Sequence, residues 1–195
     1  MTFQEIAGGV SVFGSLVGTA IYIREVICGK VKPHAFTWFV WFLLMGIAAA
    51  VGFAGGAVVN AVVLACGALM NFSISVLALK YGEKRITLSD KGTFAAALAI
   101  IPVWYATKEP LTAALLVTTI DTLGLWPTLR KAWGSPWEES SKVFGLFSVT
   151  SLFCVLSVSP YTLTTGLYPT MSLLMNLIVV SLVLTRRRIL PCQEG

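Results

Sequence analysis

Charged residues are scarce in this sequence. Of its 195 residues, 12% are Asp, Glu, Lys or Arg, and His34 is its single histidine. A soluble domain of this length carries about 25% charged residues, so the charge present cannot cover the surface of a water-soluble globule. This shortage excludes a soluble enzyme, a disordered chain and a nucleic-acid-binding domain. The four cysteines and the histidine have no metal-ligand or disulfide spacing, so we expect no metal, no cofactor and no enzymatic activity.

Apolar runs, in contrast, fill most of the chain. Hydrophobic residues make up 56% of it and the mean hydropathy is +0.83, and a membrane-spanning helix needs about 20 such residues. Charged residues mark the ends of the runs. The shortest run is closed by Lys91 and Lys108, whose long side chains can reach the two interfaces. We predict seven transmembrane helices, over residues 3–23, 35–54, 57–79, 92–107, 111–129, 141–159 and 162–185.

Lys and Arg fall almost entirely on one side of this arrangement. Alternate loops and the tail hold thirteen of the fourteen cations, and Lys108 is the exception. Because cytoplasmic loops carry the positive excess, we expect the N-terminus outside and the C-terminus in the cytoplasm. The arginines at 186–188 are interpreted as a cytoplasmic anchor near anionic lipids. Short loops and the absence of a presequence favour a bacterial inner membrane.

An internal repeat relates the two ends of the chain. Leu-Met-Asn at 69–71 recurs 105 residues later at 174–176, and residues 18–33 align without gaps with residues 121–136. Both aligned loops are basic, so both are expected in the cytoplasm and the two copies have the same orientation in the membrane. Two adjacent three-helix units would have opposite orientations, and the single helix between them removes this inversion. The predicted fold is therefore an all-α integral membrane protein with two parallel three-helix repeats joined by a linker helix (3+1+3). Its predicted parts are repeat 1 over 1–80, the linker over 81–109, repeat 2 over 110–188 and a cytoplasmic tail over 189–195.

One segment resembles the signature of a known superfamily. Residues 126–131 read Trp-Pro-Thr-Leu-Arg-Lys and residues 135–140 read Ser-Pro-Trp-Glu-Glu-Ser. This resembles the PQ-loop motif of the PQ-loop and SWEET superfamily, in which a proline and a polar residue are followed by a basic, serine-rich loop. Thr128 stands where the family has Gln. The resemblance implies a carrier of sugars, amino acids or vitamins, and it also includes sorting receptors.

The same resemblance implies roles for particular residues. The family's paired pocket asparagines fall on Asn71 and Asn176, and one of its hinge prolines falls on Pro127. Arg24 stands at the corresponding place in repeat 1, which argues against a symmetric hinge.

Three polar residues are predicted to share one depth in the membrane. Asn71, Asp121 and Asn176 each lie nine or ten residues before the first cation that follows their helix. At 1.5 Å per residue they sit about 14 Å above that edge, near the middle of a hydrocarbon core about 30 Å thick. An Asp facing lipid there would cost about 2.5–3.5 kcal/mol. We therefore expect all three side chains to point inward, into a pocket.

Helical spacing adds neighbours to this pocket. The predicted substrate-binding residues are Asn71, Asn176, Asp121, Thr118, Thr122, Ser75, Ser172, Trp41 and Trp126. The two tryptophans would be platforms for a ring-like solute, with an interfacial belt as their alternative, and Asp121 is a candidate proton site. The alternative for the asparagines is ordinary hydrogen bonding between helices. The alternative for Asp121 is a permanently protonated side chain that donates a hydrogen bond and so fixes its helix in place.

These observations together predict a transporter. It would move a small polar solute, of the sugar, amino-acid or vitamin kind that the resemblance implies, by alternating access around a midplane pocket. Proton coupling is left open. The alternative is a receptor of the same fold that binds or sorts its ligand without transport. The expected partners are the small-molecule solute and the lipid bilayer, without nucleic acid, and assembly into a homo-oligomer is left open.

Overall fold

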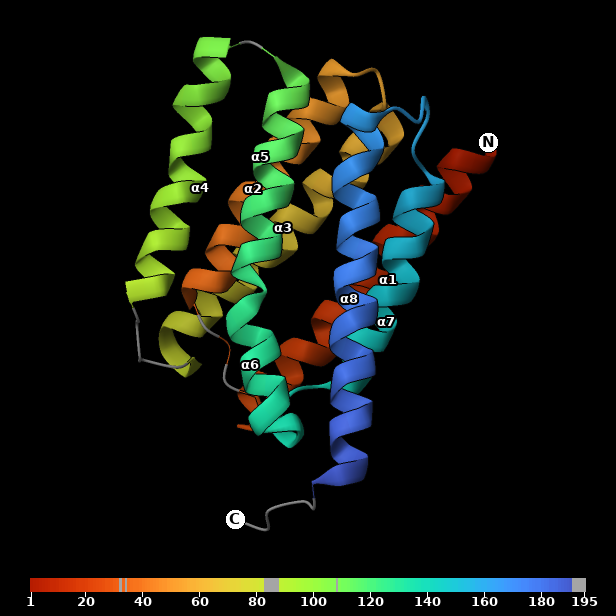
Figure 1. The fold of residues 1–195 in the computed structure, drawn as a ribbon. Helices are drawn as coiled ribbons and strands as arrows, with labels where there is room; N and C mark the ends of the chain where they lie inside the picture. Colours follow the sequence, from red (N-terminus) through yellow and green to blue (C-terminus); the bar gives the residue numbers. More distant parts are fainter. Residues whose placement is uncertain (32, 34, 83–87, 108, 191–195) are drawn as a thin grey trace.

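Every element that the structure describes is a helix, and most of the helices run side by side (Figure 1). This computed structural model describes residues 1–31, 33, 35–82, 88–107 and 109–190, so His34, Lys108 and most of the predicted tail lie outside it. The elements are α1 (Phe3–Ile27), α2 (Ala35–Ala54), α3 (Val58–Tyr81), α4 (Leu88–Thr107), α5 (Pro110–Gly124), α6 (Trp126–Gly134), the short 3-10 helix η1 (Pro136–Glu138), α7 (Ser141–Leu156) and α8 (Leu163–Ile189). The predicted all-α class is confirmed.

Four of the helices, α1, α2, α3 and α8, are long and apolar enough to cross a membrane. The shorter apolar helix α7 has 16 residues. One predicted helix, over residues 111–129, is wrong at its end, because α5 stops at Gly124 and a separate helix α6 starts at Trp126. Pro127 explains the break. It has no N–H to donate to the carbonyl four residues earlier, so the α-helical ladder is interrupted there.

Side-chain caps fix where several helices begin. Thr2 and Glu5 form a reciprocal capping box at the start of α1, with Thr2 N–H to Glu5 Oε2 at 2.8 Å. Thr162 and Thr165 form a similar box at the start of α8. Such caps satisfy backbone N–H groups that have no partner within the helix. The connection into α8 therefore turns without leaving these groups unpaired.

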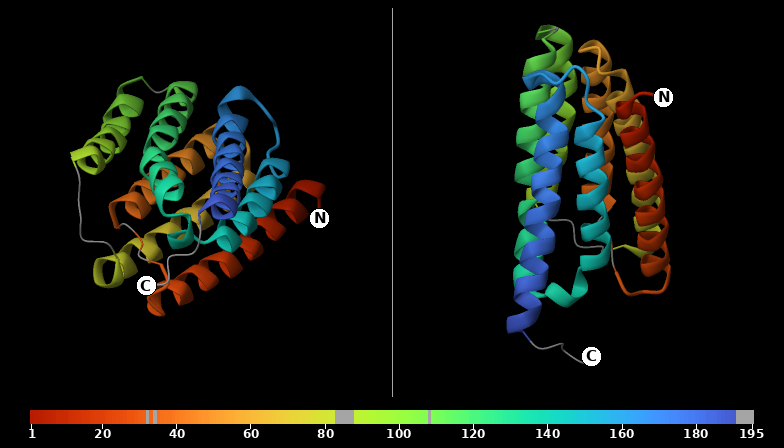
Figure 2. Two further views of the ribbon diagram at one scale, coloured as in Figure 1. Left: turned by 60° about the horizontal axis from the view of Figure 1, so that its bottom comes forward. Right: turned by 90° about the vertical axis from the view of Figure 1, so that its right-hand side faces the viewer.

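The helices pack as two groups of three with the same internal order. In the first group α3 packs against α1 and α2, and in the second group α8 packs against α5 and α7. Between the groups, α1 packs against α7 and α2 packs against α5, with smaller contacts of α2 with α8 and of α3 with α7. Exchanging α1, α2 and α3 with α5, α7 and α8 thus reproduces every one of these contacts. Helix α4 lies at the edge against α2 and α5 (Figure 2).

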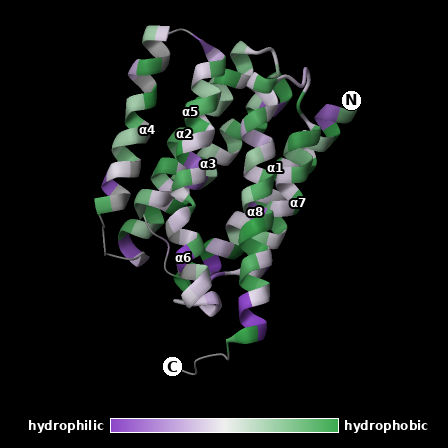
Figure 3. Cartoon of the chain, viewed as in Figure 1, coloured by the Kyte–Doolittle hydropathy of each residue, from purple (hydrophilic) through white to green (hydrophobic). Residues whose placement is uncertain are grey.

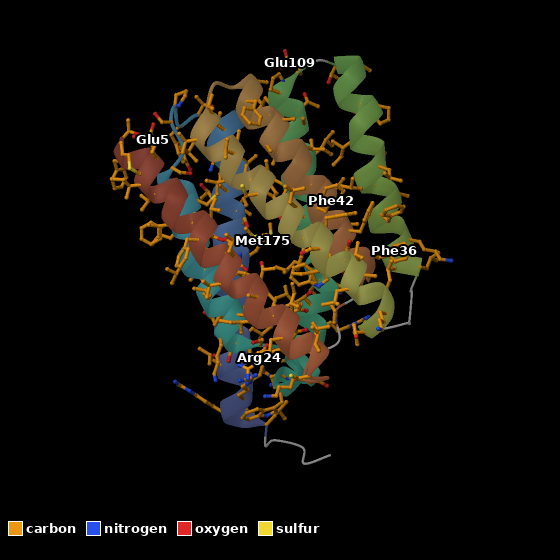
Figure 4. The ribbon with its side chains drawn as sticks, turned by 180° about the vertical axis from the view of Figure 1, so that it is seen from behind. Glu5, Arg24, Phe36, Phe42, Glu109 and Met175 are labelled. Carbon is orange, nitrogen blue, oxygen red and sulfur yellow. The ribbon has the colours of Figure 1, made fainter. Side chains whose placement is uncertain are left out.

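Hydrophobic residues extend along most of the length of the helices, and hydrophilic residues lie mainly toward the helix ends (Figure 3). Many large apolar side chains on the helices are exposed. Phe13, Leu69 and Leu123 are 70%, 66% and 67% exposed. The acidic Glu5 and Glu109 lie near one end and Arg24 lies near the other (Figure 4). An apolar surface of this extent fits a lipid environment rather than water.

Candidate functional site

A cavity of about 140 Å³ lies between the two helix groups. Residues of α1, α2 and α3 line it from one side and residues of α5, α7 and α8 from the other. Met175, one of the lining residues, lies at mid-height between the ends marked by Glu5 and Arg24 (Figure 4). A single water needs only about 10–15 Å³ of such space. The cavity is therefore large enough for a small solute or several waters.

Asp121 is the acidic residue of the cavity lining. It comes from α5 and is 6% exposed. The Trp41 indole on α2 and the Tyr168 hydroxyl on α8 lie close to its carboxyl group and can donate hydrogen bonds to it. A carboxylate removed from water needs such donors to offset the loss of hydration. The contact with Tyr168 lies within the second helix group, whereas the contact with Trp41 joins the two groups.

Asn71 and Asn176 occupy matching positions in the two groups. Asn71 Nδ2 on α3 donates to Met45 Sδ on α2 at 3.1 Å, and Asn176 Nδ2 on α8 donates to Ser151 Oγ on α7 at 3.2 Å. Asn176 also donates to the Ser172 carbonyl at 2.9 Å. Each bond between side chains joins the second and third helices of one group. With the described residues, neither amide oxygen forms a hydrogen bond, so both remain as acceptors.

Aromatic side chains form one wall of the cavity. The Tyr22 and Trp38 ring centroids are 4.8 Å apart at 48°, and those of Trp38 and Trp41 are 5.1 Å apart at 82°. Both spacings are within the usual range for interacting aromatic pairs. The wall therefore joins α1 to α2 within the first group.

The facing wall repeats this pattern in the second group. Phe144 and Phe147 of α7 line the cavity, and each lies 106 residues after its counterpart, Trp38 or Trp41. Met45 and Ser151, which accept from the two asparagines, are separated by the same offset. Sequence reasoning missed Met45, Phe144, Phe147 and Ser151. An alignment of residues 38–45 with residues 144–151 was the signal that could have found them.

The repeat is broken at Asp121. Its counterpart in the alignment of residues 18–33 with residues 121–136 is Gly18. Gly18 packs so closely on Phe147 that a Cβ there would lie 2.7 Å from Phe147 Cε1. Equivalent positions of the two groups therefore meet twice. Asp121 contacts Trp41, and Gly18 contacts Phe147. Only the first of these two contacts is polar.

The structure brings five of the nine predicted binding residues together in the cavity lining: Trp41, Asn71, Asp121, Ser172 and Asn176. The other four lie outside it. The Thr118 and Ser75 hydroxyls are buried and donate to carbonyls of their own helices at 2.8 Å. Thr122 donates likewise at 2.7 Å, and Trp126 is 67% exposed. Serine and threonine in helices often satisfy their hydroxyls in this way, so a shared helical face was not sufficient to predict a place in the lining.

The predicted hinge residue Pro127 is the second residue of α6, next to the break between α5 and α6. The corresponding helix of the first group, α1, continues through Arg24 to Ile27. The break therefore belongs to the second group alone, which agrees with the presence of proline at only one of the two positions.

Arginines of α8 hold the connection that precedes α7. The Arg187 guanidinium donates to the Pro136 carbonyl at 3.1 Å, to Ser141 Oγ at 3.0 Å and to the Glu139 carbonyl at 2.6 Å. Arg186 donates to the Trp133 carbonyl at 2.9 Å. Two of the three arginines interpreted as a lipid anchor are thus bound to the protein itself.

Among the described residues, no group of three or more His, Cys, Asp or Glu side chains could hold a metal ion. Comparison of the chain with protein-family models, with curated proteins and with solved structures finds no match.

Proposed function

We propose that this chain is a membrane carrier that binds a small polar solute in the cavity between the two helix groups. The observation that carries the proposal is the composition of the lining, to which six helices of both groups contribute and in which a buried carboxylate lies beside two amides. A site shared by two rigid groups can open to either side when the groups rock against each other. Such rocking is the basis of alternating access.

We propose that the chain crosses the membrane seven times. Four helices meet the length and hydropathy required of a span, and the proposal adds α4, α7 and the α5–α6 pair. The pair extends over residues 110–134, which matches the 25 residues of α1. The reciprocal packing of the two groups supports a pair of parallel repeats, with α4 as the linker. The resemblance to the PQ-loop and SWEET superfamily is part of this proposal.

We further propose an outer N-terminus and a cytoplasmic C-terminus in a bacterial inner membrane. The support is the distribution of charge along the chain. Thirteen of the fourteen cations fall in loops on one predicted side or in the tail, and cytoplasmic loops carry such an excess.

The proposal places the closed side of the carrier where hydrogen bonds join the two groups. Ser11 Oγ on α1 donates to the Thr150 carbonyl on α7 at 2.8 Å. Asn60 Nδ2 on α3 donates to the Cys154 carbonyl at 2.9 Å and to Ser157 Oγ at 3.2 Å, both at the end of α7. These bonds lie toward the N-terminal end of α1, beyond the cavity. In the proposed orientation they would close the outer side.

The experiment starts with a panel of sugars, amino acids, vitamins and amines, tested for a thermal shift on the purified protein. A solute that stabilises the protein is then tested for uptake into proteoliposomes. Loss of the shift in both Asn71→Ala and Asn176→Ala locates the binding site, and retention in both contradicts it. Uptake of that solute supports a carrier, whereas tight binding without uptake favours the receptor alternative. The pH dependence of uptake in Asp121→Asn tests proton coupling.

A disulfide across the two groups provides a matched control for uptake. A Cβ at Gly14 on α1 would lie 3.8 Å from the Thr150 Cβ on α7, which is the usual spacing in a disulfide. Oxidation of the Gly14→Cys, Thr150→Cys double variant should stop uptake, and reduction should restore it. Uptake that is equal in the two redox states would contradict rocking of the groups.

A further inference from the structure

The charge in the cavity is of one sign. Asp121 contributes a carboxylate, and among the residues that the structure describes no Lys, Arg or His lines the cavity. Trp41 and Tyr168 offer this carboxylate neutral donors. Within the lining, the acid therefore has no cationic partner. A solute with a positive charge would supply one.

Several other groups that face the cavity are acceptors. The amide oxygens of Asn71 and Asn176 accept no hydrogen bond from a described residue, while their nitrogens donate within their own groups. The lining adds three thioethers, which are weak acceptors: Met45, Met70 and Met175. It also holds hydroxyls that can donate as well as accept, those of Ser15 and Thr19 among them. The carboxylate and the aromatic rings are therefore the groups that would favour an ammonium group over a neutral polyol.

Aromatic rings line the same cavity from both helix groups. Tyr22, Trp38 and Trp41 form a continuous wall, and Phe144 and Phe147 line the cavity from α7. The face of an aromatic ring attracts a cation through its quadrupole, and recognition of quaternary ammonium groups by aromatic cages uses this effect. A cavity that holds both a carboxylate and such rings is a suitable site for an organic cation.

Two further acids lie near the end of the cavity where Tyr22 is found. Glu25 and Glu139 are close enough to interact electrostatically with the Tyr22 hydroxyl. Glu25 Oε2 is buried and has no hydrogen-bond partner among the described residues. Arg24 precedes Glu25 in α1, and Arg187 donates to the Glu139 carbonyl, so this end of the protein carries charges of both signs. The preference for a cation therefore rests on the cavity lining itself.

We propose that the solute of this cavity is a small organic monocation, an amine or a quaternary ammonium compound, bound with its charge between Asp121 and the aromatic rings of the two groups. The inference rests on the proposed function, since it names the class of solute for the same cavity. It follows from the chemistry of the lining, which offers one negative charge, unoccupied acceptors and π faces.

The test uses two solutes of nearly the same shape, choline and 3,3-dimethylbutan-1-ol, which differ by a positive nitrogen in place of a carbon. Their affinities for the purified full-length protein are measured by titration calorimetry. We expect choline to bind at least about 10-fold more tightly than the neutral alcohol. Equal affinity of the two solutes would overturn the inference. So would no binding of choline at about 10 mM, roughly tenfold above the upper end of common KM values for small substrates.

Variants locate the charge that is recognised. Asp121→Asn should lower the affinity for choline about 10-fold or more and leave the affinity for the alcohol unchanged. The matched control is Glu5→Gln, the same change at an exposed acid near the start of α1, and it should bind choline as the wild type does. An unchanged choline affinity in Asp121→Asn would contradict the assignment. If Asp121→Asn does not fold, Trp38→Leu provides the second test, with the same expected selective loss of choline.

Failure of this inference can be told apart from failure of the carrier proposal. If a neutral sugar or vitamin from the thermal-shift panel binds in an Asn71-dependent way while choline does not, the cation is wrong and the carrier proposal stands. If choline binds and is not taken up into proteoliposomes, the solute class is right and the carrier proposal is wrong.

Discussion

The indole of Trp41 on α2 lies close to the carboxyl group of Asp121 on α5 and can donate to it, and this contact joins the two helix groups at the cavity. The other two polar pairs described there, Asn71 with Met45 and Asn176 with Ser151, each lie within one group. Rocking of the groups would leave both of these pairs intact. It would separate Trp41 from Asp121, so their contact favours the state of the protein described here.

The first prediction concerns this contact. Trp41→Phe retains a ring and removes the indole N–H, so the state described here loses about 1 kcal/mol of stabilisation. We expect the opposite state to become about fivefold more populated. A cysteine in place of Ser172, a cavity residue, would then react about fivefold faster with an impermeant thiol reagent from the N-terminal side. Tyr168→Phe is the matched control, because Tyr168 and Asp121 belong to the same group; an equal increase in this variant would contradict the interpretation.

The second prediction compares two glycines of α1. Gly18→Ala places a methyl group 2.7 Å from the Phe147 ring, whereas a Cβ at Gly9 has no heavy atom within 4 Å. We expect Gly18→Ala to lower the free energy of unfolding by about 1–3 kcal/mol through overpacking. Gly9→Ala should leave it unchanged or raise it slightly, since alanine favours helix. The melting temperatures of the two variants in detergent test this prediction. Equal melting temperatures would show that the close packing at Gly18 is not required for stability.

A third prediction concerns the arginines at the end of α8. Arg187→Lys keeps the charge and loses the planar fork that reaches Pro136, Ser141 and Glu139, and lysine does not replace such a fork. We expect amide hydrogen exchange over residues 135–141 to become at least about 10-fold faster. Arg188→Lys, at an exposed position, is the control and should exchange like the wild type. Similar protection from hydrogen exchange in the wild type, Arg187→Lys and Arg188→Lys would mean that Arg187 does not hold this connection.

The fourth prediction concerns the break between α5 and α6. Pro127→Ala restores a backbone N–H at the second residue of α6, so the two helices can join into one. We expect slower hydrogen exchange at residues 123–127 and a lower rate of uptake for any solute that the carrier moves. Arg24→Ala at the corresponding position of the continuous helix α1 should leave exchange in α1 unchanged. Faster exchange in Pro127→Ala would contradict the explanation of the break.

Much of the fold could be predicted from the sequence because apolar runs leave the chain few choices. The predicted helix over 35–54 coincides with α2. The predicted ends at residues 23 and 185 were wrong, since α1 continues to Ile27 and α8 to Ile189. A charged residue does not by itself end a helix, because the helix continues past it when the side chain extends to water or, as with Arg187, binds a neighbouring loop.

The candidate site could be predicted in part. The match between residues 69–71 and 174–176 pointed to Asn71 and Asn176, and depth pointed to Asp121. Facing partners such as Trp41 with Asp121 depend on how the two groups pack, which the pattern of a single helix does not contain. Thr122 shows the limit of helical spacing, because its hydroxyl is satisfied by its own helix.

The most direct test of the account is the accessibility of one cavity residue from both sides of the membrane. Ser172→Cys is made in a chain whose native cysteines are replaced, and an impermeant thiol reagent is applied to right-side-out and to inside-out vesicles. Alternating access predicts that the cysteine is labelled from either side, and that the solute found in the binding panel slows labelling from both. Labelling from one side alone, unchanged by the solute, would contradict a carrier that works between these two helix groups.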